Sequence, residues 1–285
     1  MHIILGGTGQ VGAAAARYLL ARGEPVTIVT RDASRGDSLR AAGAEIAVAD
    51  IGDARSLHRI LACGNRALLL NPPANPAGDV DADESASVAA ILAALEGVPL
   101  EKVVVISTYG ARPGTQCGDL TVLHALEQGA LAQPIPAAIN RGAFYMSNWL
   151  APARQAHERG RLVSFLPGDM PLAMVSPDDL GQAAARRLLD PAGDVAPWHV
   201  EGPRRYTPRD VAHTLSTIWG RAVRLDVVPP RDWEARYRQA GFSAASAHSF
   251  ARMTGVVVDG GIEEPDDPVR GQTDLESYLR VSLFS

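Results

Sequence analysis

A glycine-rich loop near the start of the chain constrains the fold more than any other stretch. It reads Gly6-Gly7-Thr8-Gly9-Gln10-Val11-Gly12, directly after the apolar run 2–5 and at the start of a small-residue helix expected over 11–20. A strand, a glycine loop and a helix in this order are the context that makes such a loop a dinucleotide site. The helix N-terminus offers free N–H groups to a pyrophosphate. We therefore expect cofactor contacts from Gly6, Thr8, Gly9, Gln10, Val11 and Gly12.

Composition excludes several other classes of protein. The chain has 285 residues, of which 46% are hydrophobic, which is enough for a large buried core. The net charge of -5 gives no reason to expect a nucleic-acid partner. No apolar run approaches the length of a membrane span, and the two cysteines, Cys63 and Cys117, make no disulfide framework. We expect a cytoplasmic protein with no membrane partner and no bound metal.

Apolar strands alternate with helices through most of the chain, which predicts a doubly wound parallel α/β sheet of the Rossmann type. The strands are expected at 25–30, 45–49, 66–70, 102–106, 136–140 and 197–201, and the helices at 38–42, 54–62, 84–95, 119–131 and 178–189. The acidic stretch 78–84 is expected to be exposed. Residues 255–273 are expected to be irregular, and 274–285 to form a short docking helix.

The predicted elements divide the chain into two parts. Residues 1–141 form the dinucleotide-binding domain, and 172–201 return to it. Residues 142–171 and 202–285 form a small C-terminal α/β cap, which we expect to cover the carboxyl ends of the strands.

Charged residues after the second strand bear on the choice of cofactor. An acid about 20 residues after the glycines binds the ribose 2′-hydroxyl of NAD, whereas an arginine there accommodates the 2′-phosphate of NADP. This chain has Arg31 at the strand end, with Arg35 four residues later. We therefore expect NADP(H) to be preferred. NAD(H) stays possible because Asp32 is adjacent.

Further cofactor contacts are expected where the other strands end, because open α/β sheets bind ligands at the carboxyl ends of their strands. These candidates are Asp50, Ile51, Asn71, Pro72, Ser107 and Thr108. For Asp50, a role beside the adenine and simple turn formation are both open.

An aromatic-rich segment follows the strand 136–140 in a chain with only 5% aromatic residues. It either lines an apolar pocket for a substrate or forms a packing seam between sheet and cap. The candidate substrate-binding residues are Tyr109, Phe144, Tyr145, Asn148 and Trp149. Tyr109 and His124 are the candidate proton donors, with structural roles as the alternative for both.

The lysine content excludes one familiar mechanism. Short-chain dehydrogenases protonate a carbonyl with a tyrosine that has a lysine four residues after it. Lys102 is the only lysine in this chain, and Val98 stands four residues before it. The chain therefore cannot use a tyrosine–lysine pair.

The sequence resembles the NmrA-like branch of the atypical short-chain dehydrogenases/reductases. The resemblance spans nearly the whole chain and is carried by the stretches 6–12, 30–31, 50–53, 107–111, 140–148, 176–180 and 200–203, and by Glu127. Many relatives have a lysine four residues before this acid, where this chain has Leu123. The departure concerns acid–base catalysis more than cofactor binding.

The resemblance implies an NADP(H)-binding oxidoreductase that passes a hydride to a quinone-like or other flat apolar small-molecule acceptor. One alternative is a non-catalytic NAD(P)-binding redox sensor that acts through a protein partner. Another is a biosynthetic reductase or isomerase of a specialised metabolite.

Overall fold

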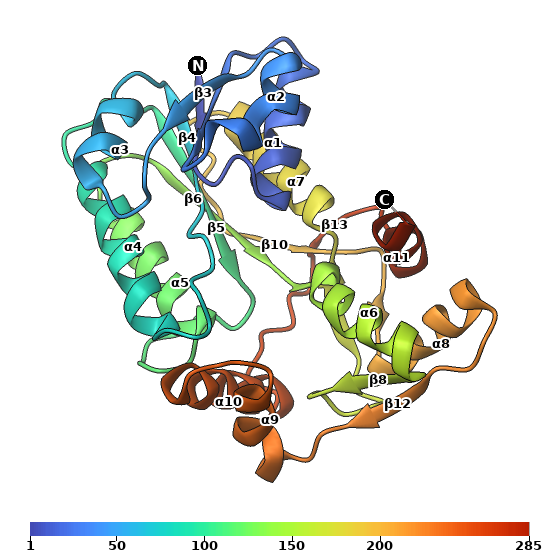
Figure 1. Cartoon of the computed structure of the whole chain (residues 1–285). Coiled ribbons are helices and arrows are strands. Elements are labelled where there is room, and N and C mark those ends of the chain that lie inside the picture. Colours follow the sequence, from blue (N-terminus) through green and yellow to red (C-terminus); the bar gives the residue numbers. More distant parts are fainter. Residues whose placement is uncertain (285) are drawn as a thin grey trace.

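The computed structural model describes residues 1–284 and contains an eight-stranded parallel sheet (Figure 1). The strand order is β13-β10-β6-β5-β4-β1-β2-β3, and every neighbouring pair is parallel. The strands are β1 (His2–Ile4), β2 (Val26–Thr30), β3 (Glu45–Val48), β4 (Arg66–Leu69), β5 (Lys102–Thr108), β6 (Ala137–Gly142), β10 (Trp198–Glu201) and β13 (Val269–Arg270). The order reverses beside β1, so the crevice typical of ligand binding opens after that strand.

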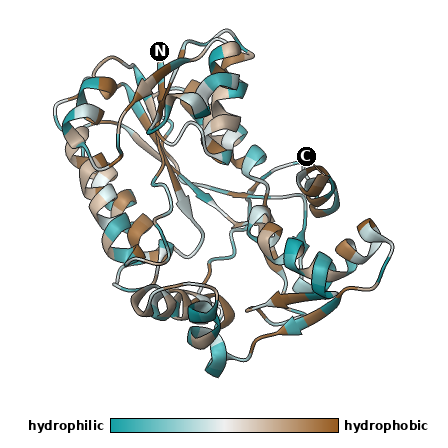
Figure 2. Cartoon of the chain, in the orientation of Figure 1, coloured by the Kyte–Doolittle hydropathy of each residue, from teal (hydrophilic) through white to brown (hydrophobic). Residues whose placement is uncertain are grey.

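Helices cover both faces of this sheet, as the alternating sequence predicts. One face carries α1 (Gln10–Leu20), α2 (Asp37–Ala41), which follows the 3-10 turn Ala33–Gly36, and α7 (Pro177–Leu189). The other face carries α3 (Ala54–Leu61), α4 (Val80–Ala94) and α5 (Asp119–Leu131). Gly181 of α7 packs against α1 so closely that a Cβ would lie 2.4 Å from the carbonyl oxygen of Val11. Hydrophobic residues dominate the central strands in Figure 2, as a sheet covered on both faces requires.

A smaller region with its own core follows β6. Its strands are β7 (Phe144–Tyr145), β8 (Arg161–Ser164), β9 (Leu172–Val175), β11 (Arg205–Tyr206) and β12 (Arg224–Val227). Its helices are α6 (Leu150–Arg159), α8 (Pro208–Trp219), α9 (Trp233–Gln239), α10 (Ala244–Val258) and α11 (Leu275–Phe284), with 3-10 turns at Met146–Trp149 and Pro230–Asp232. In Figure 1, α9 and α10 lie below α4 and α5, away from α8. No helix within residues 1–284 is long and apolar enough to cross a membrane.

The structure corrects three local expectations. The helix expected at 84–95 begins one turn earlier, at Val80, because Asp79 accepts a hydrogen bond from the Ala82 N–H and caps it. As a result Glu84 is 3% exposed, although 78–84 was expected to be exposed. The stretch 255–273 is not wholly irregular, since α10 continues to Val258 and β13 forms within it.

One strand of the segment 202–285, which we assigned to the cap, lies in the main sheet. Val269 and Arg270 of β13 pair with Val200 and Glu201 of β10. The closing helix is present as α11 and packs into the core of the smaller region, with Ser285 outside the described residues.

Candidate functional site

The glycine loop lies at the point where the strand order reverses. Gly6 has a φ of +60°, which makes the tight turn after β1. A Cβ on Gly12 would lie 2.4 Å from the carbonyl oxygen of Gly6, so only glycine lets α1 pack on the loop. Gly9 is the N-cap of α1, has no side-chain cap, and the first turn of α1 carries no acid. The N-terminus of α1 therefore presents uncapped N–H groups and a positive dipole end, which suits a pyrophosphate.

The end of β2 is tied to this loop. The hydroxyls of Thr8 and Thr30 lie 3.3 Å apart, which fixes the loop beside the strand end. Asp32 accepts hydrogen bonds from the N–H and the hydroxyl of Ser34, at 2.9 and 2.7 Å, and these bonds lower the pKa of Asp32. The carboxylate of Asp32 is thus engaged in its own turn. The side chains of Arg31 and Arg35 are exposed and have no hydrogen-bond or ion-pair partner within residues 1–284.

The remaining predicted cofactor residues lie at the carboxyl ends of β3, β4 and β5. Asp50 is exposed and accepts a hydrogen bond from the Gly52 N–H at 2.8 Å, and Ile51 is partly buried. Asn71 and Ser107 each have a buried side-chain oxygen that lacks a hydrogen-bond partner in the described chain. Thr108 donates to the carbonyl of Tyr109 at 3.2 Å. Pro72 is partly buried beside Asn71.

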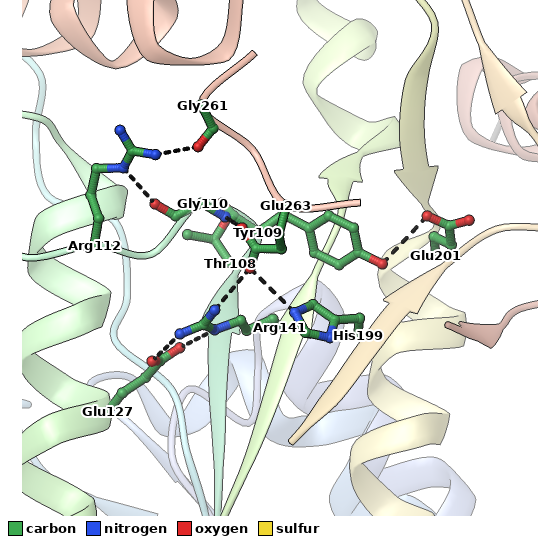
Figure 3. Close-up of polar contacts among 10 residues, drawn as sticks. All are labelled: Thr108, Tyr109, Gly110, Arg112, Glu127, Arg141, His199, Glu201, Gly261 and Glu263. Atoms are coloured by element: carbon green, nitrogen blue, oxygen red, sulfur yellow. Dashed lines mark hydrogen bonds and ion pairs between the residues drawn. The ribbon is translucent and has the colours of Figure 1, made fainter. Parts of the chain in front are cut away.

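Beside these residues a partly buried polar network joins β5, β6 and β10 to the segment after α10 (Figure 3). Glu127 on α5 is 2% exposed and accepts two hydrogen bonds from Arg141, at 2.9 and 2.8 Å. Arg141 also pairs with Glu263 at 2.9 Å, and Glu263 contacts His199 Nε2 at 3.2 Å. The Gly110 N–H donates to Glu263 as well. The sequence alone does not indicate Glu263 or His199, because these contacts join residues far apart in the chain.

The charged side chains in this network stabilise one another in their ionised forms. The hydrogen bonds and the charge of Glu127 raise the pKa of Arg141, which holds the guanidinium in its cationic form. Burial acts to raise the pKa of Glu263, but hydrogen bonds from backbone N–H groups and from Arg141 lower it overall. Glu127 and Arg141 thus form a structural pair, and Glu263 fastens the segment after α10 to the sheet.

Tyr109, a candidate proton donor, is buried rather than open to a substrate. Its ring is 4% exposed and packs edge-on against His199, with centroids 5.2 Å apart. Its hydroxyl donates to Glu201 at 3.4 Å (Figure 3). Burial, and then the negative charge of Glu201, raise the pKa of Tyr109. In this arrangement the Tyr109 hydroxyl is engaged in a hydrogen bond to Glu201 inside the protein.

The other predicted substrate residues are divided between core and surface. Trp149 is 4% exposed and lies in the core of the smaller region, beside Phe144 at a centroid distance of 5.9 Å. Asn148 is exposed, and Phe144 and Tyr145 are partly exposed. His124 lies in α5, partly buried, and its Nδ1 is enclosed without a hydrogen-bond partner in residues 1–284. Of the aromatic side chains expected to form a pocket, Trp149 therefore packs inside the core of the smaller region.

A glycine loop at the reversal of a parallel sheet, followed by an uncapped helix, defines an NAD(P)H-binding Rossmann protein. The model of a family described as "NAD(P)H-binding" matches residues 6–129. The chain is 24% identical over 225 residues to the NAD(P)H azoreductase of Xenophilus azovorans, covering 79% of this chain and 76% of that protein.

Two solved structures share the fold over the full length. The NADPH-dependent quinone oxidoreductase of Escherichia coli, complexed with NADPH, has a TM-score of 0.82 at 21% identity and covers 100% of both chains. The Citrobacter sp. triphenylmethane reductase complexed with NADP(H) has a TM-score of 0.82 at 19% identity, covering 99% of this chain and 100% of that one. These similarities agree with the resemblance of the sequence to the NmrA-like branch of the atypical short-chain dehydrogenases/reductases.

Proposed function

We propose that this protein is an NADPH-dependent reductase that transfers a hydride to a flat, apolar, quinone-like acceptor. The proposal rests on two features that lie at the same end of the sheet. The glycine loop leaves the N-terminus of α1 uncapped for a pyrophosphate, and the partly exposed ring of Tyr145 stands where the chain leaves β6. A similar protein is named an NAD(P)H azoreductase, and structures of this fold include quinone and triphenylmethane reductases.

The residues of this chain would hold the cofactor and the acceptor in separate ways. The backbone of Gly6–Gly12 and the N-terminus of α1 bind the pyrophosphate. Arg31 and Arg35 bind the 2′-phosphate by charge-assisted hydrogen bonds, which supports NADPH over NADH. The bound nicotinamide supplies the hydride, since the cofactor carries the redox chemistry. Phe144 and Tyr145 border the acceptor, and aromatic rings favour flat apolar molecules.

A turnover assay tests the proposal. Purified protein is mixed with NADPH and a panel of 1,4-quinones, and the absorbance of NADPH is followed. We expect the loss of NADPH to depend on both protein and quinone, and to slow when Tyr145 is replaced by alanine. Leu131→Ala, which changes an exposed apolar residue at the end of α5, is the control and should leave the rate unchanged.

The main alternative is a redox sensor that binds the cofactor without turning it over. The absence of a tyrosine–lysine pair favours it, as does the burial of the Tyr109 hydroxyl. Tight NADPH binding with no turnover on any quinone would support the sensor and contradict the reductase. Absence of NADPH binding would contradict both.

A further inference from the structure

Two positively charged side chains are buried at the amino end of the sheet, away from the glycine loop. Lys102, the only lysine in the chain, is the first residue of β5, and Arg187 lies in the last turn of α7. Both residues are 0% exposed. Lysine and arginine are almost never fully buried unless they are paired with an acid. Two buried cations in one place therefore require negative charge nearby.

A single turn of the chain brings these two cations together. In the loop between α7 and β10, the Asp194 N–H donates to the Pro191 carbonyl at 3.0 Å. Lys102 Nζ donates to the same Pro191 carbonyl at 3.0 Å, and Arg187 Nη2 donates to the Asp194 carbonyl at 3.3 Å. The first and last Cα atoms of a four-residue turn lie less than ~7 Å apart. The ammonium and the guanidinium therefore lie beside the same turn, 191–194.

Most of the hydrogen-bond donors on these two side chains are unused. A guanidinium carries five N–H donors in its plane, and an ammonium carries three. Nε and Nη1 of Arg187 are enclosed and have no hydrogen-bond partner in residues 1–284. The guanidinium carbon lies 4.3 Å from the centroid of the Trp198 ring, which covers one face of the guanidinium and accepts none of the in-plane donors. The buried guanidinium therefore has room in its bonding pattern for a further acceptor.

The acids of the loop do not pair with either cation. Asp190 and Asp194 act on both charges from a distance, but neither carboxylate forms an ion pair with them in the described part of the chain. Burial lowers the pKa of Arg187, and burial followed by the charge of Arg187 lowers the pKa of Lys102. By contrast Arg66, which is beside Lys102 in the sheet, has a carboxylate of its own at 3.2 Å. Positive charge is therefore in excess around the turn 191–194.

We propose that Lys102 and Arg187 bind a small monovalent anion, such as chloride, beside the turn 191–194. An anion accepts hydrogen bonds from the Arg187 donors and also balances charge, whereas a water molecule supplies only the first of these. The anion is small because both side chains are fully buried, so a phosphate or a sulfate would have to displace the turn. The site is separate from the proposed cofactor site and does not depend on the reductase function.

The thermal stability of the cofactor-free protein tests this site. An anion that binds only the folded state raises the melting temperature by mass action. At equal ionic strength we expect the protein to melt about 3–5 °C higher in sodium chloride than in sodium gluconate, once chloride exceeds its dissociation constant roughly tenfold. Gluconate is too large for an enclosed site, and equal ionic strength keeps the screening of surface charges the same.

Substitutions at adjacent residues of α7 separate this site from other effects of chloride. Arg187→Met removes the charge and keeps a long side chain, so we expect the difference between the two salts to disappear. Arg186→Met, at an exposed arginine one residue earlier, is the matched control and should keep the full difference. Lys102→Met leaves one of the two charges, so it should need a chloride concentration at least about tenfold higher for the same effect. A difference that persists in Arg187→Met would overturn the proposal.

Anomalous diffraction from wild-type crystals soaked in sodium bromide locates the anion without relying on any variant. We expect a bromide peak within hydrogen-bonding distance of Arg187 Nε or Nη1, on the side that faces Lys102. Density for a water molecule there, with no bromide peak, would overturn the proposal, as would equal melting temperatures in the two salts. A bromide peak only at exposed arginines such as Arg31 would mean that chloride acts elsewhere, and would overturn it too.

Discussion

The proposed preference for NADPH rests on three residues after β2: Arg31, Asp32 and Ser34. Position 31, at the strand end, is an arginine, and the acid that could bind a ribose hydroxyl, Asp32, is bound to Ser34 instead. That carboxylate caps a short turn, and turning it toward a ribose would leave the Ser34 N–H without its partner. The side chain of Arg31, at the end of β2, therefore has hydrogen-bond donors that remain free within residues 1–284.

The substitution Arg31→Ala tests this assignment. We expect the dissociation constant of NADPH to rise about tenfold to 100-fold, because a charge-assisted hydrogen bond contributes ~1.5–3 kcal/mol and 1.4 kcal/mol is tenfold. The dissociation constant of NADH should hardly change. Quenching of protein fluorescence measures both. Arg159→Ala, an exposed arginine at the end of α6, is the control, and an unchanged NADPH preference would contradict the assignment.

Single acidic residues were the least predictable part of the site. A run of acids such as 78–84 indicates an exposed surface, since Asp and Glu are rarely buried unless they are paired. Glu84 is nevertheless buried, and its Oε1 accepts a hydrogen bond from the N–H of Ala74, in the loop before α4. The Glu263 carboxylate is likewise held by its contacts with Gly110, Arg141 and His199. No local pattern contains that information.

At the scale of elements, the proposed pyrophosphate site rests on the loop before α1. Gly9, the N-cap of α1, has φ −80° and ψ 170°, a conformation that an ordinary N-cap residue also adopts. A capping side chain there would satisfy the free N–H groups that the pyrophosphate needs. We therefore expect the glycine at this position to keep the proposed pyrophosphate site open at a small cost in helix stability.

Gly9→Asp should separate stability from binding. The aspartate would cap α1, so the cofactor-free protein should unfold at the same urea concentration or slightly higher, by a few tenths of a kcal/mol. Its negative charge would meet the pyrophosphate, and we expect the NADPH dissociation constant to rise about 100-fold. Gly9→Ala, which adds a Cβ without charge, should weaken binding far less. Equal losses in the two variants would point to steric disruption instead.

Helices and strands were largely predictable because their signals are local. The N-caps Asp53, Ser176 and Thr207 each accept a hydrogen bond from a backbone N–H in the first turn that follows. The early start of α4 is hard to predict because Asp79, its N-cap, is one of several acids in this stretch. β13 is hard to predict because two residues show no periodicity, and they form a strand only by pairing with β10.

At the scale of the whole molecule, the segment between α10 and β13 connects the two parts of the protein. Ile262 packs so closely on Gly110 that a Cβ there would lie 2.3 Å from its Cδ1. Glu263 then binds Gly110, Arg141 and His199 at the ends of β5, β6 and β10 (Figure 3). Since β13 adds the last strand to the main sheet directly after this segment, we expect the two parts to unfold together.

Glu263→Gln tests this connection. The variant keeps the shape but loses the charge that faces Arg141, so we expect the free energy of unfolding at pH 7 to fall by about 1–3 kcal/mol. The pKa of Glu263 is lowered in the folded protein, so its contribution is present above its ordinary pKa of 4.5 and disappears as the pH falls toward the folded pKa. Urea unfolding at pH 7 and at pH 4 should therefore show a smaller difference between wild type and variant at pH 4. Glu264→Gln, at a side chain that is 76% exposed, should change the free energy by less than about 0.5 kcal/mol at either pH. Equal effects of the two substitutions would mean that Glu263 does not fasten the segment.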